Sequence, residues 1–301
     1  MSVFVCGSLH LDVIVEAPGL PRLDETVVGT GVRYAFGGKG GNQAVAAARM
    51  GAGTAMAGRV GRDEFGAKLL AGLAEAGVDA GGIQRDDGAS GMSVAIVGDN
   101  GGYGAVIVSA ANLRIDADQI AVPAAACVVV LQNEIPEAVN LAVARKARDG
   151  GATIILNAAP ARVVSPQLLD FTDLLVINRV EAAAMLGLAD IGADLAGAVL
   201  ALSKLGARAV IVTLGGDGLV LIENGRVEAM PALTVDVVSS HGAGDAFLGA
   251  LAAELDRGAG LAEACRFGMA AAALHVSLPV EARGAVTPDD VRAAARQAGM
   301  Q

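Results

Sequence analysis

The sequence of residues 126–157 is ACVVVLQNEIPEAVNLAVARKARDGGATIILN. It contains a continuous apolar run, Ala126–Leu131, then a helical pattern that opens at Pro136 and closes at Gly150, and then a second apolar run, Thr153–Leu156. Proline suits the first turn of a helix. Apolar runs without polar alternation are typical of strands buried on both faces of a parallel sheet. The segment therefore predicts a strand–helix–strand unit of an α/β domain.

The same alternation extends in both directions along the chain. Further strands are expected at Val3–Cys6, Thr54–Ala57, Leu174–Ile177 and Ala209–Leu214. Further helices are expected at Gly41–Met50, Glu64–Ala76, Ala193–Leu205 and Leu248–Leu255. Asp63 before the second of these helices and a glycine after each of the first three are typical end signals. The pattern predicts a parallel sheet with helices on both faces.

Two segments depart from this alternation. Residues 13–36 contain short strand patterns and no helix, and Ser90–Val97 and Tyr103–Ser109 flank the hairpin-turn signal Asp99-Asn100-Gly101-Gly102. We expect these segments to form a small sheet that stands off the main domain. A second hairpin is expected around Asn224-Gly225, between residues 218–222 and 226–230.

Composition and charge exclude several classes of protein. Of 301 residues, 53% are hydrophobic and 18% charged, which excludes a disordered chain. The net charge is −10 and the densest basic cluster is Arg145–Arg148, so a nucleic-acid partner is not expected. Despite a mean hydropathy of +0.53, no apolar run reaches the roughly 18 residues of a membrane span, and the N-terminus has no basic start. We expect a soluble, cytoplasmic protein without a membrane partner. Three widely spaced cysteines predict reduced thiols.

The segment His241-Gly242-Ala243-Gly244-Asp245 directly precedes a helical pattern. Small residues at this point let successive backbone amides face one anion, to which the helix dipole adds attraction. Asp245 by itself is consistent with an ordinary helix-start residue. A carboxylate beside an anion-binding turn is also what a phosphoryl-transfer site requires to accept the proton of an attacking hydroxyl.

A second glycine-rich segment, Phe36-Gly37-Gly38-Lys39-Gly40-Gly41-Asn42-Gln43-Ala44, also leads into a helical pattern. It is either a flexible turn or a place where the backbone approaches a ligand closely. It is not a Walker A loop, because no Ser or Thr follows the lysine.

Polar side chains follow several of the expected strands, where open α/β sheets bind ligands. These are Asp12, Glu134, Asn157, Asn178 and Glu181. Each alone is consistent with a cap or turn residue, but together they indicate a site at the carboxyl ends of the strands.

Residues 37–50 and 241–251 resemble the two signatures of the PfkB family of carbohydrate kinases, and within it the ribokinases. Intermediate segments extend the resemblance along essentially the whole chain, among them Gly7-Ser8, Leu156–Ala161, Asn178–Glu181 and Thr213–Gly216. The resemblance implies a Rossmann-like, three-layer α/β/α ribokinase-like domain with a small β-sheet lid that pairs into a homodimer. The α/β domain would comprise residues 1–11, 38–87 and 111–301, and the lid residues 12–37 and 88–110.

The resemblance also assigns roles to residues. Asp245 is implied as the catalytic base toward a primary hydroxyl of a sugar, with ribose the leading candidate. The amides of Gly242, Ala243 and Gly244 are implied as the anion hole for the γ-phosphoryl group of ATP. The implied sugar-binding residues are His10, Asp12, Gly38, Lys39, Asn42, Glu134 and Asp245. The implied nucleotide-binding residues are Asn178, Thr213, Gly215, Gly216, Gly218, His241, Gly242 and Gly244. Glu181 is implied to hold Mg²⁺ through water.

The chain departs from the ribokinase pattern at three places. Ser239-Ser240 stands where those sequences carry Asp-Thr, whose aspartate helps to bind an activating potassium ion. The later loop that completes that site is lengthened around residues 278–283. Both changes argue against potassium activation with Ser239 as a ligand. The third departure is His10, which replaces a sugar-contacting Asn.

Three other functions compete with that of a sugar kinase. A nucleoside kinase would use the same fold, with apolar lid residues facing the pocket. A non-catalytic sugar- or nucleotide-binding protein is disfavoured because Asp245 and Gly242–Gly244 are present. A dehydrogenase is disfavoured because no Gly-x-Gly-x-x-Gly follows the first strand.

Overall fold

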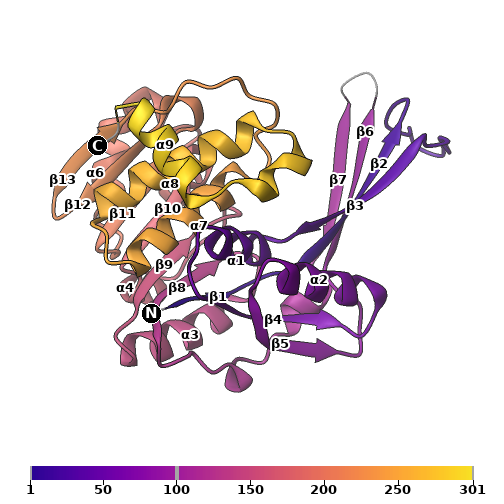
Figure 1. Cartoon of the computed structure of the whole chain (residues 1–301), viewed down its shortest axis with the longest axis horizontal. Coiled ribbons are helices and arrows are strands. Elements are labelled where there is room, and N and C mark those ends of the chain that lie inside the picture. The colour runs from indigo at the N-terminus through magenta and orange to yellow at the C-terminus, as the bar shows by residue number, and fades with distance from the viewer. Residues whose placement is uncertain (1, 99–101, 300–301) are drawn as a thin grey trace.

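The computed structural model describes residues 2–98 and 102–299, which form two sheets and the helices around them (Figure 1). The strands of the large sheet are β1 (Ser2–Cys6), β4 (Thr54–Gly61), β5 (Asp79–Asp86), β8 (Ala126–Gln132), β9 (Thr153–Asn157), β10 (Leu174–Asn178), β11 (Ala209–Thr213), β12 (Leu219–Glu223) and β13 (Arg226–Met230). Those of the small sheet are β2 (His10–Ala17), β3 (Gly31–Gly37), β6 (Met92–Gly98) and β7 (Tyr103–Val108). The helices are α1 (Lys39–Arg49), α2 (Glu64–Glu75), α3 (Glu137–Asp149), α4 (Pro166–Phe171), α5 (Arg179–Leu186), α6 (Leu195–Leu202), α7 (Ala243–Asp256), α8 (Leu261–Ser277) and α9 (Pro288–Gln297). Short 3₁₀ segments occur at Ala110–Arg114, Ala117–Gln119, Gly192–Asp194, Gly215–Asp217 and Val280–Ala285.

The large sheet has the strand order β13-β12-β11-β10-β9-β8-β1-β4-β5. All neighbouring pairs from β5 to β11 are parallel, and β12 and β13 add an antiparallel hairpin at one edge. The chain builds outward from β1 first through β4 and β5, and later through β8, β9 and β10. The order therefore reverses between β1 and β8, and such a switch point is where open α/β sheets bind ligands.

Helices cover both faces of the large sheet, as the continuous apolar strands predict. In β1, Phe4 and Cys6 pack with residues of α3 to α6 on one face. Val3 and Val5 pack with residues of α1, α2, α7 and α8 on the other face. Helix α9 packs outside α7 and α8. This three-layer arrangement is the α/β/α ribokinase-like fold expected from the sequence. In the described ranges, no helix combines the length and the hydropathy needed to span a membrane.

The small sheet has the order β3-β2-β6-β7 and projects from one side of the large body (Figure 1). Its register pairs Asp12 with Ser93 and Ser93 with Ile107, so these residues lie on one face together with His10. The opposite face carries the exposed apolar side chains Val32, Tyr34, Val106 and Val108.

The observed elements differ from the expected ones in several details. Asp12 lies within β2 rather than after the first strand. The single helix expected at 193–205 is a 3₁₀ turn followed by α6, because the Asp194 carboxylate accepts the Gly197 amide at 2.9 Å and caps the helix there. The turn predicted at Asp99-Asn100-Gly101-Gly102 lies outside the described residues except for Gly102, and the strands on both sides of it pair as an antiparallel hairpin.

Candidate active site

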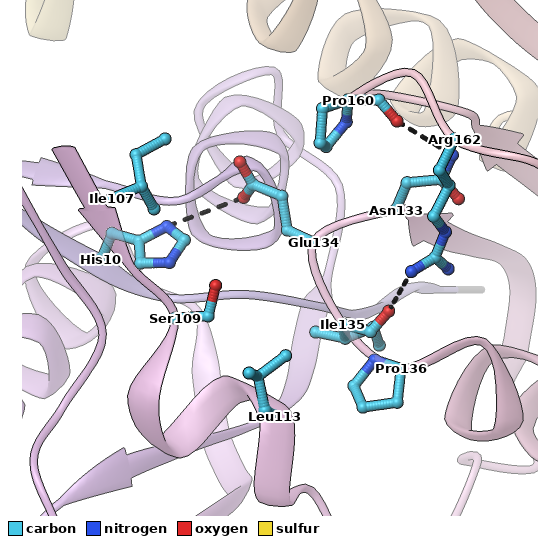
Figure 2. A pocket seen from close by; sticks show the side chains of 10 residues that line it. All are labelled: His10, Ile107, Ser109, Leu113, Asn133, Glu134, Ile135, Pro136, Pro160 and Arg162. Atoms are coloured by element: carbon cyan, nitrogen blue, oxygen red, sulfur yellow. Dashed lines mark hydrogen bonds and ion pairs between the residues drawn. The ribbon is translucent and has the colours of Figure 1, made fainter. Parts of the chain in front are cut away.

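The site is built at the switch point, where the chain leaves β1 and β8. Glu134, just beyond β8, accepts hydrogen bonds from the Ser8 hydroxyl and from the Lys39 amide, the latter at 2.8 Å. His10 Nδ1 lies 3.7 Å from the same carboxylate oxygen, Glu134 Oε2 (Figure 2). Glu134 thus ties together the ends of two neighbouring strands and the start of α1.

The glycine-rich segment before α1 packs directly against the backbone after β1. Gly38 has φ of 87°, and a Cβ there would lie 2.7 Å from the amide nitrogen of His10 and 2.8 Å from the carbonyl oxygen of Ser8. The Gly41 amide donates to the same Ser8 carbonyl at 2.9 Å. Only glycine fits this conformation and this approach. The segment is therefore a close backbone junction rather than a loose turn.

Asp245 lies in the first turn of α7 with only 9% of its surface exposed. Its carboxylate accepts hydrogen bonds from Asn42 Nδ2 at 3.2 Å and from Gln43 Nε2 at 2.9 Å. Gln43 Nε2 also donates to Asn157 Oδ1 at 3.0 Å. Two side chains of α1 thereby orient the carboxylate of a helix about two hundred residues away.

Burial raises the pKa of Asp245, an effect opposed by the positive charge of Lys39 and by the hydrogen bonds from Gln43 and Asn42. A carboxyl group that is more basic than usual is a better proton acceptor near neutral pH. Burial also raises the pKa of Glu181, which again is opposed by its hydrogen bonds with Asn178 and by the Lys39 charge. Lys39 thus acts electrostatically on two buried carboxyl groups.

The backbone before Asp245 forms an open turn, residues 242–245, here called the α7 turn. Gly242 is in the left-handed region with φ of 79°, and a Cβ there would lie 2.9 Å from His275 Nε2. The Ala243 amide donates to the Ser240 carbonyl at 3.3 Å, whereas the amides of Gly242, Gly244 and Asp245 donate to no other described residue. Free amides at a helix start are suited to bind an anion.

Glu134 and His10 also line a pocket of about 200 Å³. Its lining includes His10, Glu134 and Asn133 together with Ile107 of the small sheet (Figure 2). Arg162 Nη1 donates to the Ile135 carbonyl at 2.8 Å, while its buried Nε and Nη2 have no partner among the described residues. Apolar walls are added by Leu113, Ile135, Pro136 and Pro160.

Asp12 and His10 face this region from the small sheet. The Asp12 carboxylate accepts a hydrogen bond from the Ser93 hydroxyl. Burial lowers the pKa of His10, although the nearby Glu134 and Asp12 charges oppose this, and its Nε2 is buried without a described partner. A neutral imidazole with a free ring nitrogen is a ready hydrogen-bonding group for a ligand.

At the ends of β10 and β11, the candidate nucleotide residues form a more exposed region. Asn178 and Glu181 form a reciprocal capping box at the start of α5, with bonds of 2.9 and 2.8 Å. The Thr213 hydroxyl donates to the Ile177 carbonyl at 3.4 Å. Gly215 and Gly216 are exposed with open space around them, whereas Gly218 is buried and a Cβ there would overlap the Met230 carbonyl. Gly218 is thus required by the close approach of the chain at the end of β13.

The structure brings together Glu134, Lys39, Asn42 and Asp245, as the sequence analysis expected of one site. Ser239 and His241 lie just outside this cluster, and their carbonyl oxygens accept hydrogen bonds from Arg283. The residues that sequence reasoning missed include Gln43, Ser93, Asn133 and Arg162. Gln43 lies within the glycine-rich motif but had no role assigned, and nothing in the local sequence of the other three distinguishes them from ordinary strand and loop residues.

Comparisons with known proteins identify the family of the chain. The model of the pfkB family carbohydrate kinases matches residues 1–283. A ribokinase of Haemophilus influenzae is 33% identical over 283 residues, covering 91% of each chain. The structure of Arabidopsis thaliana ribokinase complexed with ribose and ATP superposes with a TM-score of 0.89 at 28% identity, covering 98% of each chain. A nucleoside kinase of Burkholderia thailandensis, complexed with inosine, shares the fold at a TM-score of 0.81 and 18% identity, covering 99% of this chain and 97% of its own.

The chain belongs to the PfkB family of carbohydrate kinases. It is a phosphotransferase with an alcohol group as acceptor, and its relatives at about one-third identity are ribokinases.

Proposed function

We propose that this protein is an ATP-dependent sugar kinase that transfers the γ-phosphoryl group to a primary hydroxyl of ribose. The observation that carries the proposal is the buried Asp245 carboxylate beside the free amides of the α7 turn. A proton acceptor and an anion-binding turn on the same helical turn provide the two elements that phosphoryl transfer to an alcohol requires. Ribose is supported by the relatives of Haemophilus influenzae, Mus musculus and Bacillus subtilis, which are named ribokinases.

In this proposal, Asp245 accepts the proton of the attacking hydroxyl. The amides of Gly242 and Gly244, with that of Ala243 or Asp245, stabilise the negative charge of the transferring group. Asn42 and Gln43 keep the Asp245 carboxylate in place, so that little reorientation is needed at the moment of reaction.

The sugar would lie between Asp245 and the His10 pocket. Asp12, Lys39, Asn42 and Glu134 supply carboxylate, ammonium and amide groups for its hydroxyls, and Gly38 lets the backbone approach it closely. His10 offers a free ring nitrogen on the same side. Polar groups of this kind select a ligand rich in hydroxyls because each buried group needs a partner.

The nucleotide would lie over the ends of β10 and β11, near Asn178, Thr213, Gly215 and Gly216, with His241 and Gly218 at its border. In the described residues, no group of three His, Cys, Asp or Glu side chains is arranged to hold a metal ion by itself. The residues present fit Mg²⁺ held by phosphate oxygens and water, with the Glu181 carboxylate beyond the water. When bound with ATP, the ion would neutralise phosphate charge.

The test is acceptor-dependent ADP release from Mg-ATP across pentoses, hexoses and nucleosides, with wild type and Asp245→Asn. We expect turnover on ribose and a loss of roughly 10²- to 10⁴-fold in the variant, the range of general-base catalysis. ATP affinity of both proteins, measured by calorimetry, controls for folding. A variant within a few-fold of wild type removes Asp245 from this role. ATP and ribose binding without turnover indicates a non-catalytic binding protein.

A second candidate, a nucleoside kinase, is favoured by one specific observation. Ile107 from the small sheet and four further apolar residues line the pocket beside His10. Apolar walls next to the sugar could hold a base. A higher kcat/KM for a nucleoside than for ribose in the same panel would establish this reading.

We also propose that the small sheet, residues 12–37 and 88–110, acts as a lid and pairs with a second copy of the chain. Support comes from the apolar residues Val32, Tyr34, Val106 and Val108, which are exposed on the face turned away from the site. Burying such a face in a dimer removes apolar surface from water. Sedimentation equilibrium should give a dimer for wild type and a monomer for Val106→Asp.

A further inference from the structure

Arg283 is the one buried residue of the exposed 3₁₀ segment Val280–Ala285, with 8% of its surface exposed. Its guanidinium group donates three hydrogen bonds to backbone carbonyls. Nε donates to Leu278 at 3.1 Å, Nη1 to His241 at 3.2 Å and Nη2 to Ser239 at 3.2 Å. Nη1 also lies 3.0 Å from His275 Nε2. Thus a buried cation is held by carbonyl oxygens from three separate positions.

None of the ion pairs within residues 2–98 and 102–299 involves Arg283. A buried charge normally requires a countercharge or a full set of hydrogen bonds. Here the carbonyl dipoles provide the compensation. A ring of carbonyl oxygens is also the chemistry by which proteins replace the water shell of a potassium ion.

The residues around Arg283 do not fit a monovalent metal ion. The carbonyl oxygens of Ser239 and His241 already accept guanidinium hydrogen bonds. Ser239 offers a hydroxyl in place of a carboxylate, and its Oγ accepts the His241 amide at 3.4 Å. A second cation at these oxygens would face the Arg283 charge.

The position of these contacts links Arg283 to the α7 turn. Ser239 and His241 directly precede Gly242, and the Ser240 carbonyl accepts the Ala243 amide at 3.3 Å. His275, the other neighbour of the guanidinium, packs against the Cα position of Gly242. Because the guanidinium is planar and its donors are fixed, it holds both carbonyls in one geometry. Movement of this group would move the amides that face the transferring phosphoryl group.

We propose that Arg283 is a built-in cation that positions the α7 turn, so that the enzyme works without a monovalent cation. The inference rests on the proposed kinase function, because the positioned amides are those assigned to the phosphoryl group. Arg283 acts through the backbone of residues 239–242 and not by contact with substrate.

The test compares turnover with Mg-ATP of wild type, Arg283→Ala and Arg283→Lys in buffer whose only added monovalent cation is tetramethylammonium. Potassium chloride or guanidinium chloride is then added at low millimolar concentration. We expect wild-type turnover to be the same with and without potassium. Arg283→Ala should lose about 10²-fold in kcat, the effect of misplacing anion-hole donors, with the acceptor KM within a few-fold of wild type. Guanidinium or potassium should restore part of the lost kcat.

Arg148→Ala is the matched control, because Arg148 also donates to a backbone carbonyl, that of Phe171 at 2.6 Å, far from the site. Arg148→Ala should change the stability of the protein, but its kcat should not respond to added guanidinium. Potassium activation of wild type, wild-type kcat in Arg283→Ala, or a loss that neither ion rescues would overturn the proposal. If Arg283→Ala does not fold, Arg283→Lys carries the test. We expect Arg283→Lys to have a reduced kcat that added potassium does not raise. A wild-type kcat in Arg283→Lys, or its activation by potassium, would overturn the proposal.

The two proposals fail in different ways. Potassium-dependent turnover on a sugar would refute the built-in cation and leave the kinase intact. Absence of turnover on every acceptor would refute the kinase. In that case the ATP affinity, measured by calorimetry, tests the role of Arg283. We expect the ATP affinity of wild type to be independent of potassium. The ATP affinity of Arg283→Ala should be weaker and should recover when guanidinium is added.

Discussion

Replacing Gln43 with Met should move the pH at which the enzyme becomes active. Gln43 Nε2 donates to Asp245 Oδ1 at 2.9 Å inside a buried site, and this hydrogen bond favours the ionised carboxylate. Methionine has a similar length and no donor. The variant therefore favours the protonated form of Asp245, which cannot accept the proton of the acceptor hydroxyl.

The size of the effect follows from the strength of the lost bond. A hydrogen bond to a charged group contributes about 1.5–3 kcal/mol. One pKa unit corresponds to about 1.4 kcal/mol, so the pKa of Asp245 should rise by about 1 to 2 units. The acidic limb of the kcat/KM profile, which reports groups of the free enzyme, should move to higher pH by the same amount. Above that limb, kcat should stay within a few-fold of wild type.

The assay is acceptor-dependent ADP release measured from acid to alkaline pH. Gln132→Met is the matched control, because Gln132, at the end of β8, is likewise a buried amide, yet its side chain has no described hydrogen-bond partner. Its limb should coincide with that of wild type. A Gln43→Met limb at the wild-type pH, or an equal loss at every pH, would refute the electrostatic role of Gln43.

Two further predictions concern stability. Gly38→Ala should lower the free energy of unfolding by about 2–4 kcal/mol, since φ is 87° and the new Cβ meets backbone atoms at 2.7–2.9 Å. Urea unfolding measures this loss of stability. Gly150→Ala is the control, because Gly150 has φ of −81° and a Cβ there would have no contact shorter than 3.5 Å. Equal losses in the two variants would contradict the prediction. His10→Asn should flatten the fall of stability with acidification. Burial lowers the pKa of His10 below 6.5, so below that pH the unfolded chain gains a proton that the folded chain does not, and stability falls by up to about 1.4 kcal/mol per pH unit. Parallel wild-type and variant curves in urea unfolding between pH 5 and 7 (roughly the titration range of a free imidazole) would exclude this effect.

The sequence predicted the large sheet well because its central strands are apolar on both faces. The run Leu174–Ile177, for example, matches β10 (Leu174–Asn178) within one residue. The edge strand β5 was not anticipated, since Asp79–Asp86 is rich in glycine and charge and pairs on one side only. Its strand conformation depends on β4 rather than on its own residues.

The residues of the site also divide into those that the local sequence predicts and those that depend on distant contacts. Asp245 and Lys39 could be found because they lie in glycine-rich segments before helices. Arg162 and Arg283 could not, because their surroundings come from residues far away along the chain, such as Ser239 for Arg283. A lengthened loop was evident around residues 278–283, but not the direction in which its arginine points. Long-range contacts of a single polar side chain leave no periodic signal.

The interior position of β1 in the large sheet has a consequence for how the chain assembles during synthesis. Val5 lies between Met56 of β4 and Val130 of β8, so β1 is made long before its second partner strand, β8. The small sheet needs only residues up to Val108 and can form earlier. A nascent chain at this stage would expose an open edge of β1, and contacts so distant in sequence slow folding. For this protein, the interval between synthesis of β1 and of β8 is therefore the period in which chaperone protection has the most to contribute.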